Sequence, residues 1–571
     1  MEEAQEEAKL QRFLHWLQVN GVELRGCQIK FCGSDKGFGV FSSNDDGEGI
    51  LLIAPLNLAI TPMRVLQDPL IGRKCRALFQ EGDLDDRFLM MLFLCVERAH
   101  KNSTWKPYLD MLPSTFGTPL WFTEDELLEL KGTALYKATT MQKKNLQALF
   151  DDKVKHLVEE LLSLDGEFDS VVHFEDFLWA NSIFWTRALN IPFPRCYVYP
   201  QLPEQENSSS CHNKQLKVQA TQISLEALSD CKDKMGDPLS VRQTKDTEVE
   251  STSTQTETIW VEGLVPGIDF CNHDSKAIAL WEVDKSGSVT GTPLSMYLKL
   301  VAKNDFPADK EIHISYGNKG NEELLYLYGF VVDNNPDDYL MLHYPTEALQ
   351  QVPCAESKAQ LLEIQKAEMR CLLGKSLLQN GFFSQNHSQN EDIMHPNVPV
   401  INYSWSGTRK APSYLNKLVF PENFMTALRT IAMEEDELLQ VSSLLEELNG
   451  SMEDEIALTE ADTCAAIWEV CGDAGALQLL VDLLTSKVME LEEGSGAEAH
   501  DKELLENACI CEAIKEELKS DSEENVVKGK KLKMTRNRWS AIIYRHGQKE
   551  LTRLFLKEAE QALHLCLSDQ A

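Results

Sequence analysis

A long polar segment, residues 201–258, interrupts the chain between two stretches that carry the patterns of folded structure. Ser, Gln, Thr, Glu and Lys dominate this segment, and large apolar residues are few. Such a composition cannot bury enough apolar surface to offset the conformational entropy that is lost on ordering. The sequence therefore predicts a disordered insertion loop here, and a folded domain that includes both sides of it must tolerate the interruption.

The apolar pattern before this loop changes from helical to strand-like and back. Apolar residues at helical spacing end at Gly21, which predicts an N-terminal helix over residues 1–20. Four short apolar runs with Gly, Asp and Pro between them predict a small, irregular antiparallel sheet within residues 21–84: CQIKF (27–31), GVFSS (39–43), ILLIAP (50–55) and LAITP (58–62). Amphipathic patterns then return, so that residues 85–200 are expected to be mainly helical.

Strand signals resume after the loop and then give way to helices. Two β-like runs, 295–302 and 310–317, flank the turn-rich residues 304–309 and are predicted to form a hairpin. From residue 345 to residue 571 the pattern is nearly all helical, apart from a loop over Ser384–Lys410. The fold class predicted is α+β: an irregular small-sheet domain with a helical insert, followed by an all-α domain.

The chain is strongly acidic, with 90 Asp and Glu against 55 Lys and Arg and a formal net charge of −35 at pH 7. Most of such a surface repels a polyanion, so nucleic acid is not expected to be the principal partner. One basic cluster, Lys528–Lys533 with Arg536 and Arg538, follows an acidic run and is interpreted as part of a solvated linker, with nucleic-acid contact as the less favoured alternative.

The first residues lack the basic start and apolar core of a secretory signal, and their glutamates argue against a transit peptide. No apolar run approaches the roughly 20 residues that span a bilayer. The 15 cysteines form no repeated close pairs, which favours a reducing compartment over a disulfide framework. A cytoplasmic or nuclear protein without membrane contact is expected.

Four short motifs lie next to the strand signals: GFG (37–39), DFCNHD (269–274), ISYG (314–317) and YGF (328–330). In GFG two residues lack side chains, so that a ligand could approach the backbone, although an ordinary glycine turn has the same composition. In NHD a metal site would need further His or Cys ligands, and only Cys271 is close, so no metal is predicted. A lone histidine more often orients itself by hydrogen bonds than transfers protons.

Two further side chains allow both a functional and a structural interpretation. Arg187 ends a helix-like segment, where a guanidinium could hold a carboxylate bidentately or could be a surface or helix-capping residue. Tyr316 lies where the chain leaves a strand, and the commonest role of a tyrosine at such a place is a structural one in the core. The residues alone leave these alternatives open.

The order and setting of the motifs resemble those of SET-domain methyltransferases. The helical insert and the helical C-terminal part make the chain similar to the Rubisco large-subunit methyltransferase type, which acts mainly on non-histone proteins. The resemblance implies the following organisation: an N-terminal helix (1–20), a first SET part (21–84), a helical SET insert (85–200), a disordered loop (201–258), a second SET part with the cofactor and catalytic motifs (259–332) and a helical substrate-binding domain (345–571).

This resemblance also implies a cofactor, S-adenosylmethionine, and residues that hold it. In the family the GFG loop contacts the cofactor through backbone groups, which corresponds to Lys36 and Phe38. Lys36 departs from the acidic residue that is frequent there. The family's arginine at the position of Arg187 faces the amino-acid end of the cofactor. Asn272 and the His273 backbone are implied to hydrogen-bond the adenine, a role that suits an amide because it both donates and accepts.

The implied chemistry is transfer of a methyl group to a lysine side chain. In the family the tyrosine that corresponds to Tyr316 contributes to cofactor binding and positions the amine and the methyl group, and Tyr328 and Phe330 correspond to walls of the aromatic lysine pocket. An unperturbed lysine has a pKa of about 10.4. Desolvation in an aromatic channel and a nearby sulfonium charge both lower this pKa, so that no protein base is required.

Other functions were weighed against this hypothesis. One branch of the subgroup methylates a histidine of actin, and it has an asparagine and a tryptophan where this chain has Leu189 and Ile268, which favours lysine. A histone substrate and a catalytically inactive SET-like scaffold are further alternatives. The partner expected is a protein substrate with a basic docking surface, bound by a monomeric enzyme through its C-terminal helices.

Overall fold

The computed structural model describes residues 2–33, 36–43, 49–82, 84–164, 166, 171–199, 258–301, 307–384, 412–450, 459–510 and 532–570. The predicted disordered loop over residues 201–258 lies outside these ranges except for Thr258. The predicted loop over Ser384–Lys410 lies outside them except for Ser384. Both loops therefore stay predictions.

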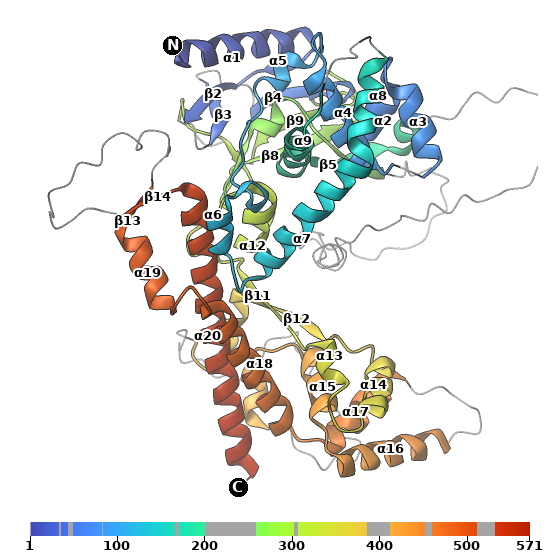
Figure 1. Ribbon diagram of the computed structural model, residues 1–571, viewed down its shortest axis with the longest axis vertical. Helices are drawn as coiled ribbons and strands as arrows, with labels where there is room; N and C mark the ends of the chain where they lie inside the picture. The colour runs from blue at the N-terminus through green and yellow to red at the C-terminus, as the bar shows by residue number, and fades with distance from the viewer. Residues whose placement is uncertain are drawn as a thin grey trace, which may run out of the picture. The chain divides into compact units, whose positions relative to one another are not determined.

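The chain forms two compact units, each built from two stretches of sequence (Figure 1). Unit 1 comprises Met1–Ser114 and Gln147–Ser315, and unit 2 comprises Thr115–Leu146 and Tyr316–Ala571. The division differs from the predicted domains in two respects. Residues 115–146 of the predicted helical insert, and residues 316–332 of the predicted second SET part, belong to the unit that contains the C-terminal helices.

A shared apolar core explains why this stretch of the insert belongs to unit 2. Leu130 and Leu135 pack in one buried cluster with Leu325, Ala541 and Tyr544. Each large apolar side chain that is fully buried contributes about 1.5–3 kcal/mol. Contacts between residues far apart in the sequence therefore outweigh the continuity of the helical pattern, which was the only signal that the sequence offered.

The helices of unit 1 pack around one nearly fully apolar helix. They are α1 (Glu2–Val19), α2 (Pro62–Gln67), α3 (Gly72–Gln80), α4 (Asp86–Ala99), α5 (Lys106–Leu109), the π-helical η4 (Phe150–Val154), α8 (Lys155–Ser163), α9 (Phe174–Arg187) and α10 (Arg195–Val198). α4 is buried at every position from Phe88 to Glu97 and contacts α2, α8 and α9. A helix that is apolar all round belongs in a core, and α4 is the core helix here.

The strands of unit 1 form small sheets, in agreement with the predicted irregular sheet. They are β1 (Glu23–Leu24), β2 (Cys27–Gly33), β3 (Gly37–Ser42), β4 (Ile50–Pro55), β5 (Leu189–Pro194), β6 (Thr258–Gly263), β7 (Asn272–His273), β8 (Ala279–Asp284), β9 (Ser295–Leu300) and β10 (His313–Ile314). One sheet has the order β1-β4-β9-β8, and the other strands pair as β2-β3, β5-β6 and β7-β10.

The hairpin predicted between residues 295–302 and 310–317 is wrong. β9 pairs antiparallel with β4 on one edge and with β8 on the other. Both of its hydrogen-bonding edges are therefore occupied, and none is left for the following strand. β10 instead pairs in parallel with β7. This pairing places Asn272 and His273 of the predicted cofactor motif beside β10.

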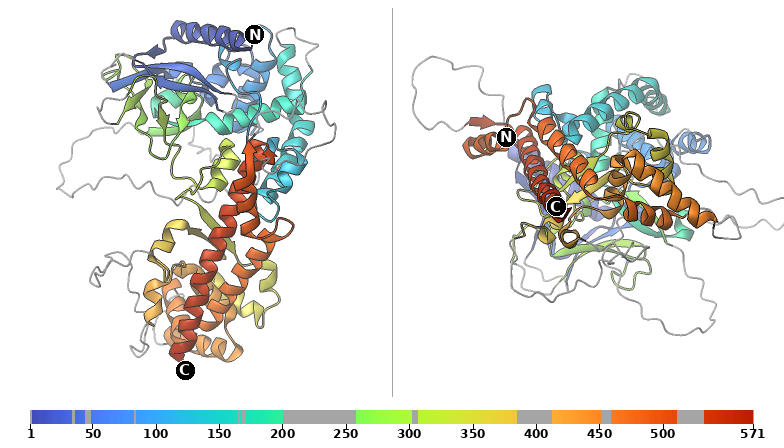
Figure 2. Two further views of the ribbon diagram at one scale, coloured as in Figure 1. Left: turned by 90° about the vertical axis from the view of Figure 1, so that its left-hand side faces the viewer. Right: turned by 90° about the horizontal axis from the view of Figure 1, so that it is seen from below.

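Unit 2 is mainly helical, with long helices that pack side by side. Its helices are α6 (Glu124–Leu128), α7 (Ala134–Leu149), whose end belongs to unit 1, α12 (Asn321–Glu323), the π-helical η6 (Leu324–Tyr328), α13 (Thr346–Leu349), α14 (Ala355–Ile364), α15 (Glu422–Ala432), α16 (Glu435–Gly450), α17 (Glu460–Val470), α18 (Ala474–Glu492), α19 (Glu498–Asn507) and α20 (Arg536–Gln570). α20, red in Figures 1 and 2, runs beside α18 and shares a core with it that includes Leu480, Leu551 and Phe555.

The fold class predicted from the sequence, α+β, is confirmed. The predicted all-α part also contains short strands, since β11 (Tyr339–His343) pairs with β12 (Arg370–Gly374), and β13 (Ala508–Ile510) pairs with β14 (Leu532–Met534). Across the described ranges, no helix by itself has the length and apolarity of a membrane span, although the bent pair of α17 and α18 together satisfies both criteria.

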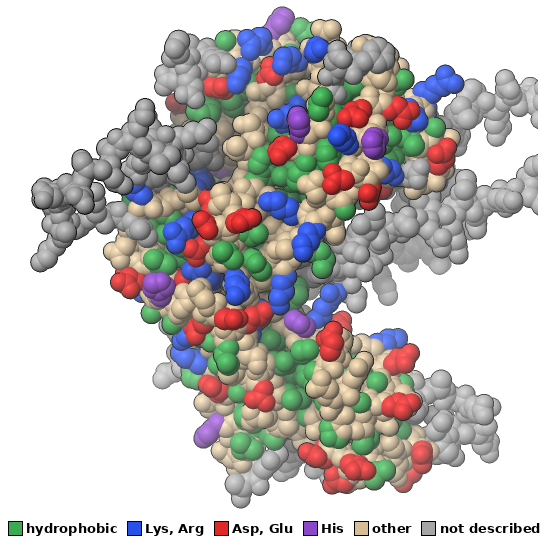
Figure 3. All heavy atoms as spheres, viewed as in Figure 1, with side chains coloured by type: hydrophobic (Ala, Val, Ile, Leu, Met, Phe, Trp, Pro, Cys, Tyr) green, Lys and Arg blue, Asp and Glu red, His purple; other side chains and the backbone are tan. Residues whose placement is uncertain are grey.

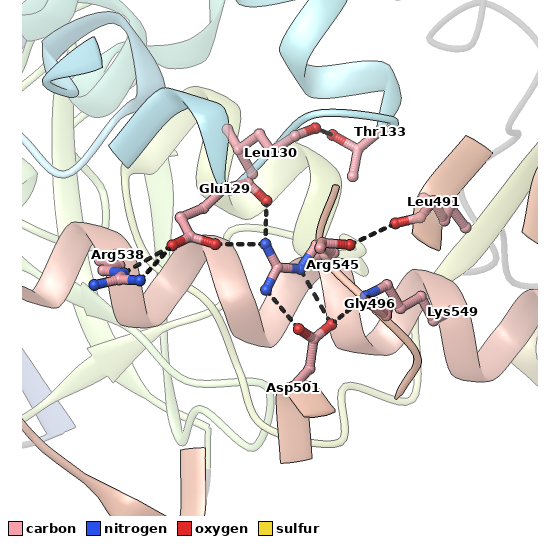
Figure 4. Close-up of polar contacts among 10 residues, drawn as sticks. Glu129, Leu130, Thr133, Leu491, Gly496, Asp501, Arg538, Arg545 and Lys549 are labelled. Atoms are coloured by element: carbon pink, nitrogen blue, oxygen red, sulfur yellow. Dashed lines mark hydrogen bonds and ion pairs between the residues drawn. The ribbon is translucent and has the colours of Figure 1, made fainter. Parts of the chain in front are cut away.

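A buried ion network joins three elements of unit 2 (Figure 4). Asp501 of α19 accepts hydrogen bonds from Arg545 and Lys549 of α20, and the Lys549 Nζ to Asp501 Oδ2 distance is 2.7 Å. Arg545 also pairs with Glu129, which follows α6. All but Glu129 are almost fully buried, so that each charge depends on its partners for the solvation that water no longer supplies.

We predict that Asp501→Ala lowers the free energy of unfolding of unit 2 by about 3–5 kcal/mol, because two buried cations lose their shared anion. Chemical denaturation followed by circular dichroism measures the loss. Lys137→Ala is the matched control, since Lys137 and Glu490 form an exposed pair that is worth about 0–1 kcal/mol. Equal and small effects of the two substitutions would contradict the importance of the buried network.

Candidate functional site

The strand segment 311–314 brings two of the predicted motifs together in unit 1. On one side the amide of Ile312 donates to the carbonyl of Val40, at 2.7 Å, next to the GFG motif of β3. On the other side β10 pairs with β7, with His313 opposite Asn272. The backbone of this one segment therefore holds GFG and the asparagine of NHD beside each other.

Gly39 is glycine because three side chains crowd its position. A Cβ on Gly39 would lie 2.7 Å from Cys32 Sγ, 2.9 Å from Glu311 Oε1 and 3.2 Å from Asn272 Nδ2. Gly37 is required for another reason, since its φ of +70° lies in the left-handed region, and a Cβ there would meet nothing within 4 Å. The motif thus combines one crowded glycine with one whose backbone is open to a ligand.

A carboxylate that was not predicted lies at the centre of this group. Asn272 Nδ2 donates to Glu311 Oε1 at 2.7 Å. His313 Nε2 and Lys36 Nζ lie 3.3 Å and 3.7 Å from Glu311 Oε2, and Cys32 Sγ contacts Oε1 at 3.8 Å. The alternation of a strand could have indicated that Glu311 and His313 share one face, but nothing in the sequence pointed to Asn272 as their neighbour.

The other two residues predicted near the GFG loop differ in their environment. The side chain of Lys36 is about half exposed, at 49%. Phe38 is buried in β3, and its ring packs against Phe31 with 5.3 Å between centroids. Phe38 therefore anchors the strand through its side chain, which leaves its backbone as the part that could contact a cofactor.

The side chain of Arg187 is mostly buried and holds the turn before NHD. It is therefore neither the surface residue nor the helix-capping residue that the sequence allowed. Its Nη1 donates to the carbonyl oxygen of Asp269 at 2.7 Å and lies 3.6 Å from the Asp269 carboxylate. The guanidinium also lies over the ring of Phe270, 4.9 Å from its centroid. These contacts fix η5 (Ile268–Phe270), the turn that leads into β7.

Asp269 is fully buried in this turn and is tied down on both oxygens. Tyr108 donates to Oδ2 at 2.6 Å and the amide of Gly267 donates to Oδ1 at 3.1 Å. Burial raises the pKa of Asp269, while Arg187, Tyr108 and the backbone donor oppose that rise. The same burial, with the nearby carboxylate, places the pKa of Tyr108 well above its usual value.

The remaining residues of NHD are placed by the backbone. His273 lies on β7 opposite Ile314. Asp274 is exposed, accepts a hydrogen bond from the amide of Lys276 at 2.8 Å, and caps the turn that follows. The carboxylates of Asp269 and Asp274 both accept hydrogen bonds from backbone amides. Within the described ranges, no group of three or more His, Cys, Asp or Glu side chains could hold a metal ion.

The three predicted aromatic residues cluster in unit 2. The rings of Tyr316 and Tyr328 lie 4.8 Å apart, and those of Tyr328 and Phe330 lie 6.3 Å apart. Burial, with a smaller contribution from Glu323, raises the pKa of Tyr328 to about 12. Tyr328 is therefore neutral at physiological pH, and the cluster offers π-faces that favour a cation or an amine.

Two glycines in contact shape the aromatic cluster. η6 ends at Gly329, which has a φ of +79°. A Cβ on Gly117 would lie 2.2 Å from the Gly329 carbonyl oxygen, and a Cβ on Gly329 would lie 2.6 Å from the Gly117 carbonyl carbon. Only glycine allows this approach of two backbones, and it orients Tyr328 and Phe330 on either side of Gly329. Gly117 was not singled out in the sequence because it lies about 200 residues earlier.

We predict that Tyr108→Phe destabilises unit 1 by about 1–3 kcal/mol, because the buried Asp269 carboxyl loses a donor. The sign of the pH dependence follows from the raised pKa of Asp269. Its contribution to stability is present at low pH and is lost as pH rises through its pKa in the fold. Removing a donor raises that pKa further, so that the loss should be greater at pH 8 than at pH 5.

Urea denaturation at the two pH values measures this effect, and Tyr199→Phe is the control because Tyr199 is exposed. A loss for Tyr108→Phe that shrinks as pH rises would contradict the inferred state of Asp269.

Comparison with known proteins supports the resemblance. The chain is 30% identical over 182 residues to the chloroplastic Rubisco large-subunit N-methyltransferase of Pisum sativum, covering 32% of this chain and 35% of that protein. It is 31% identical, over 32% of this chain and 36% of the relative, to the chloroplastic fructose-bisphosphate aldolase-lysine N-methyltransferase of Arabidopsis thaliana. The human actin-histidine N-methyltransferase is 27% identical over 335 residues, 57% of this chain and 43% of that protein.

The matches thus span about a third of the two plant relatives and less than half of the third. No protein-family model matches the chain. Among solved structures, Rubisco LSMT bound to AdoMet superposes with a TM-score of 0.57 at 18% identity over 98% of this chain and 93% of that one. The SET domain of LSMT bound to lysine and AdoHcy superposes with a TM-score of 0.56 at 19% identity, over 97% of this chain and 91% of that one. The chain therefore has the fold of the Rubisco large-subunit methyltransferase structures, and the resemblance predicted from its motifs is confirmed.

Proposed function

We propose that this chain is an S-adenosylmethionine-dependent methyltransferase that transfers a methyl group to a lysine side chain of a non-histone protein. The observation that carries the proposal is the assembly of GFG, Asn272 and Glu311 around the crowded Gly39. The plant relatives are named as an N-methyltransferase of the Rubisco large subunit and a lysine N-methyltransferase of fructose-bisphosphate aldolase, and these names support the reaction and the class of substrate.

The residues of unit 1 fit the cofactor that the resemblance implies. Gly37 leaves open space beside its backbone, while Gly39 has none, so that a ligand could reach the strand at one glycine only. Asn272 and the His273 backbone offer the donors and acceptors that an adenine ring needs, and Lys36 and Phe38 offer backbone groups. When bound, S-adenosylmethionine supplies an electrophilic methyl group.

Arg187 has a more indirect part in this proposal. Its described contacts tie it to Asp269 and Phe270, so that it shapes the turn that carries Asn272. Binding of a cofactor carboxylate by the same guanidinium is the role implied by the resemblance and stays a prediction.

In unit 2, Tyr316, Tyr328 and Phe330 are proposed to receive the lysine. Their rings would exclude water from the amine, and desolvation lowers the pKa of a lysine and so favours the neutral nucleophile. The hydroxyl of Tyr316 would hold the amine by a hydrogen bond, and alignment of the reacting groups would supply much of the acceleration.

We predict that Tyr316→Phe loses methyl transfer by about 100-fold or more, as when one positioned hydrogen-bonding group of an active site is removed, while S-adenosylmethionine binding remains. Transfer of labelled methyl to a cell lysate, with mass spectrometry of the labelled band, measures the activity and identifies the residue modified. Isothermal titration measures binding. Well-folded wild-type protein that binds no cofactor would instead favour a catalytically inactive scaffold.

Histidine methylation is the second candidate, because the matches to the actin-histidine enzymes are longer than those to the plant lysine enzymes. Two residues argue against it: Leu189, which begins β5, and Ile268, which is fully buried at the start of η5. Labelled histidine in the lysate experiment would decide for this candidate and against lysine, and labelled histone would show a different class of substrate.

The partner is proposed to be a protein with a basic docking surface. Acidic side chains gather over α16 of unit 2 (Figure 3), where Glu435, Asp436, Glu446 and Glu447 are exposed. A monomeric enzyme in the cytoplasm or nucleus, with no nucleic-acid or membrane partner, completes the proposal. The two plant relatives are named as chloroplastic, and imaging of a tagged full-length protein would test the compartment.

We predict that substrate affinity falls by about tenfold when ionic strength rises from about 0.05 M to about 0.3 M, because salt screens exposed charges. The double substitution Glu446→Lys and Glu447→Lys should weaken binding and flatten the salt dependence. Glu7→Lys, on the exposed face of α1, is the control. Affinity that ignores both salt and the α16 charges would remove this surface from the binding model.

A further inference from the structure

Glu311 has an unusual position for a charged side chain. It lies just before β10, opposite Phe41 in an isolated bridge, and its side chain is only 15% exposed. Four side chains converge on its two oxygens: Asn272 and Cys32 on Oε1, and His313 and Lys36 on Oε2. Both carboxylate oxygens are therefore enclosed by polar side chains.

Carboxylate oxygens accept hydrogen bonds, and this settles how the amide of Asn272 is turned. With Nδ2 facing Glu311 at 2.7 Å, the pair is attractive. The flipped amide would place its oxygen against the carboxylate and would repel it. Among the described residues the Asn272 oxygen has no hydrogen-bond partner, so this orientation leaves one acceptor, and the second Nδ2 proton, for a ligand.

Gly39 completes the arrangement. The absence of a Cβ lets Glu311 and Asn272 lie directly over the GFG backbone, where any side chain would come within 2.9 Å of one and 3.2 Å of the other. The carboxylate, the amide and the glycine strand therefore form one rigid arrangement, and moving Glu311 would release Asn272.

We propose that Glu311 is a positioning residue of the cofactor site, which presets the donor and acceptor pattern that Asn272 offers to S-adenosylmethionine. This inference rests on the proposed function, because it names what orients a residue of that site. Glu311 acts through Asn272 and needs no contact of its own with the cofactor.

The test is a double-mutant cycle read out by isothermal titration with S-adenosylmethionine and, separately, with S-adenosylhomocysteine. Glu311→Met keeps the volume and removes the acceptor, and it should weaken binding of both molecules by about tenfold or more. Glu311→Gln still offers an oxygen to Asn272 and should bind within about threefold of wild type. In protein that already carries Asn272→Ala, Glu311→Met should cause no further loss of affinity, because Glu311 acts on binding only through Asn272.

Asp309→Asn is the matched control. It removes one carboxylate two residues away, where the exposed Asp309 pairs with Lys30, and it should leave binding unchanged. Thermal unfolding of every variant reports on folding. A variant that loses affinity only because it is misfolded would also have a lower melting temperature. Misfolding would not explain why Glu311→Gln keeps its affinity or why Glu311→Met has no effect on the Asn272→Ala background.

Three outcomes would overturn the inference. They are wild-type affinity in Glu311→Met, an equal loss with and without Asn272, and a loss in Glu311→Gln as great as in Glu311→Met. If Glu311→Met does not fold, Glu311→Gln still tests the inference, because a tenfold loss of affinity in the folded Gln variant would overturn it. Wild-type protein that binds neither molecule would overturn the proposed function itself, which separates that failure from a failure confined to Glu311.

Discussion

The hydrogen bonds of one short strand segment, residues 311–314, are the interaction on which the candidate cofactor site depends. Ile312 donates to Val40 on one side, and β10 pairs with β7 on the other. A strand has two hydrogen-bonding edges, and here one edge takes the glycine strand and the other takes Asn272 and His273. Motifs separated by more than 200 residues thereby become neighbours. Because each edge is already used, this segment cannot also form the hairpin that its sequence suggests, and the loss of that hairpin is what makes the site.

Buried polar groups recur as the devices that keep each part in one arrangement. In unit 1, Asp269 ties η5 to Tyr108 and Arg187, and Glu311 ties Asn272 to the glycine strand. In unit 2, Asp501 and Glu129 secure α20 through Arg545. A buried charge is costly unless it is fully paired, so such groups add little net stability, but they penalise every alternative packing. Gly39 and Gly117 also favour a single arrangement, because any side chain at either position would force the neighbouring groups apart.

Several features were predictable because they depend on local pattern. The N-terminal helix, the small strands and the helical C-terminal part follow from apolar spacing, and GFG, Asn272 and the aromatic trio follow from short motifs. Glu311 and Gly117 were missed, since neither belongs to a recognisable motif and both act through residues distant in sequence. The sequence singles out Arg187, but the choice between a surface residue and a buried one needed its contacts to Asp269 and Phe270. The assignment of residues 115–146 to unit 2 needed the core that Leu130 and Leu135 share with α20.

The sequence by itself determined which residue types are available: an acidic chain, a glycine-rich strand, an amide beside a histidine, and a tyrosine at a strand end. Those choices limit the chemistry, because only certain groups can offer open backbone, paired donors and acceptors, or a neutral aromatic surface. The tertiary structure alone decided which strand edge each segment uses, which carboxylate faces Asn272 and where Gly329 meets Gly117. These outcomes depend on competition between segments for the same edges and the same buried space, and the periodicity of one segment carries no information about its competitors.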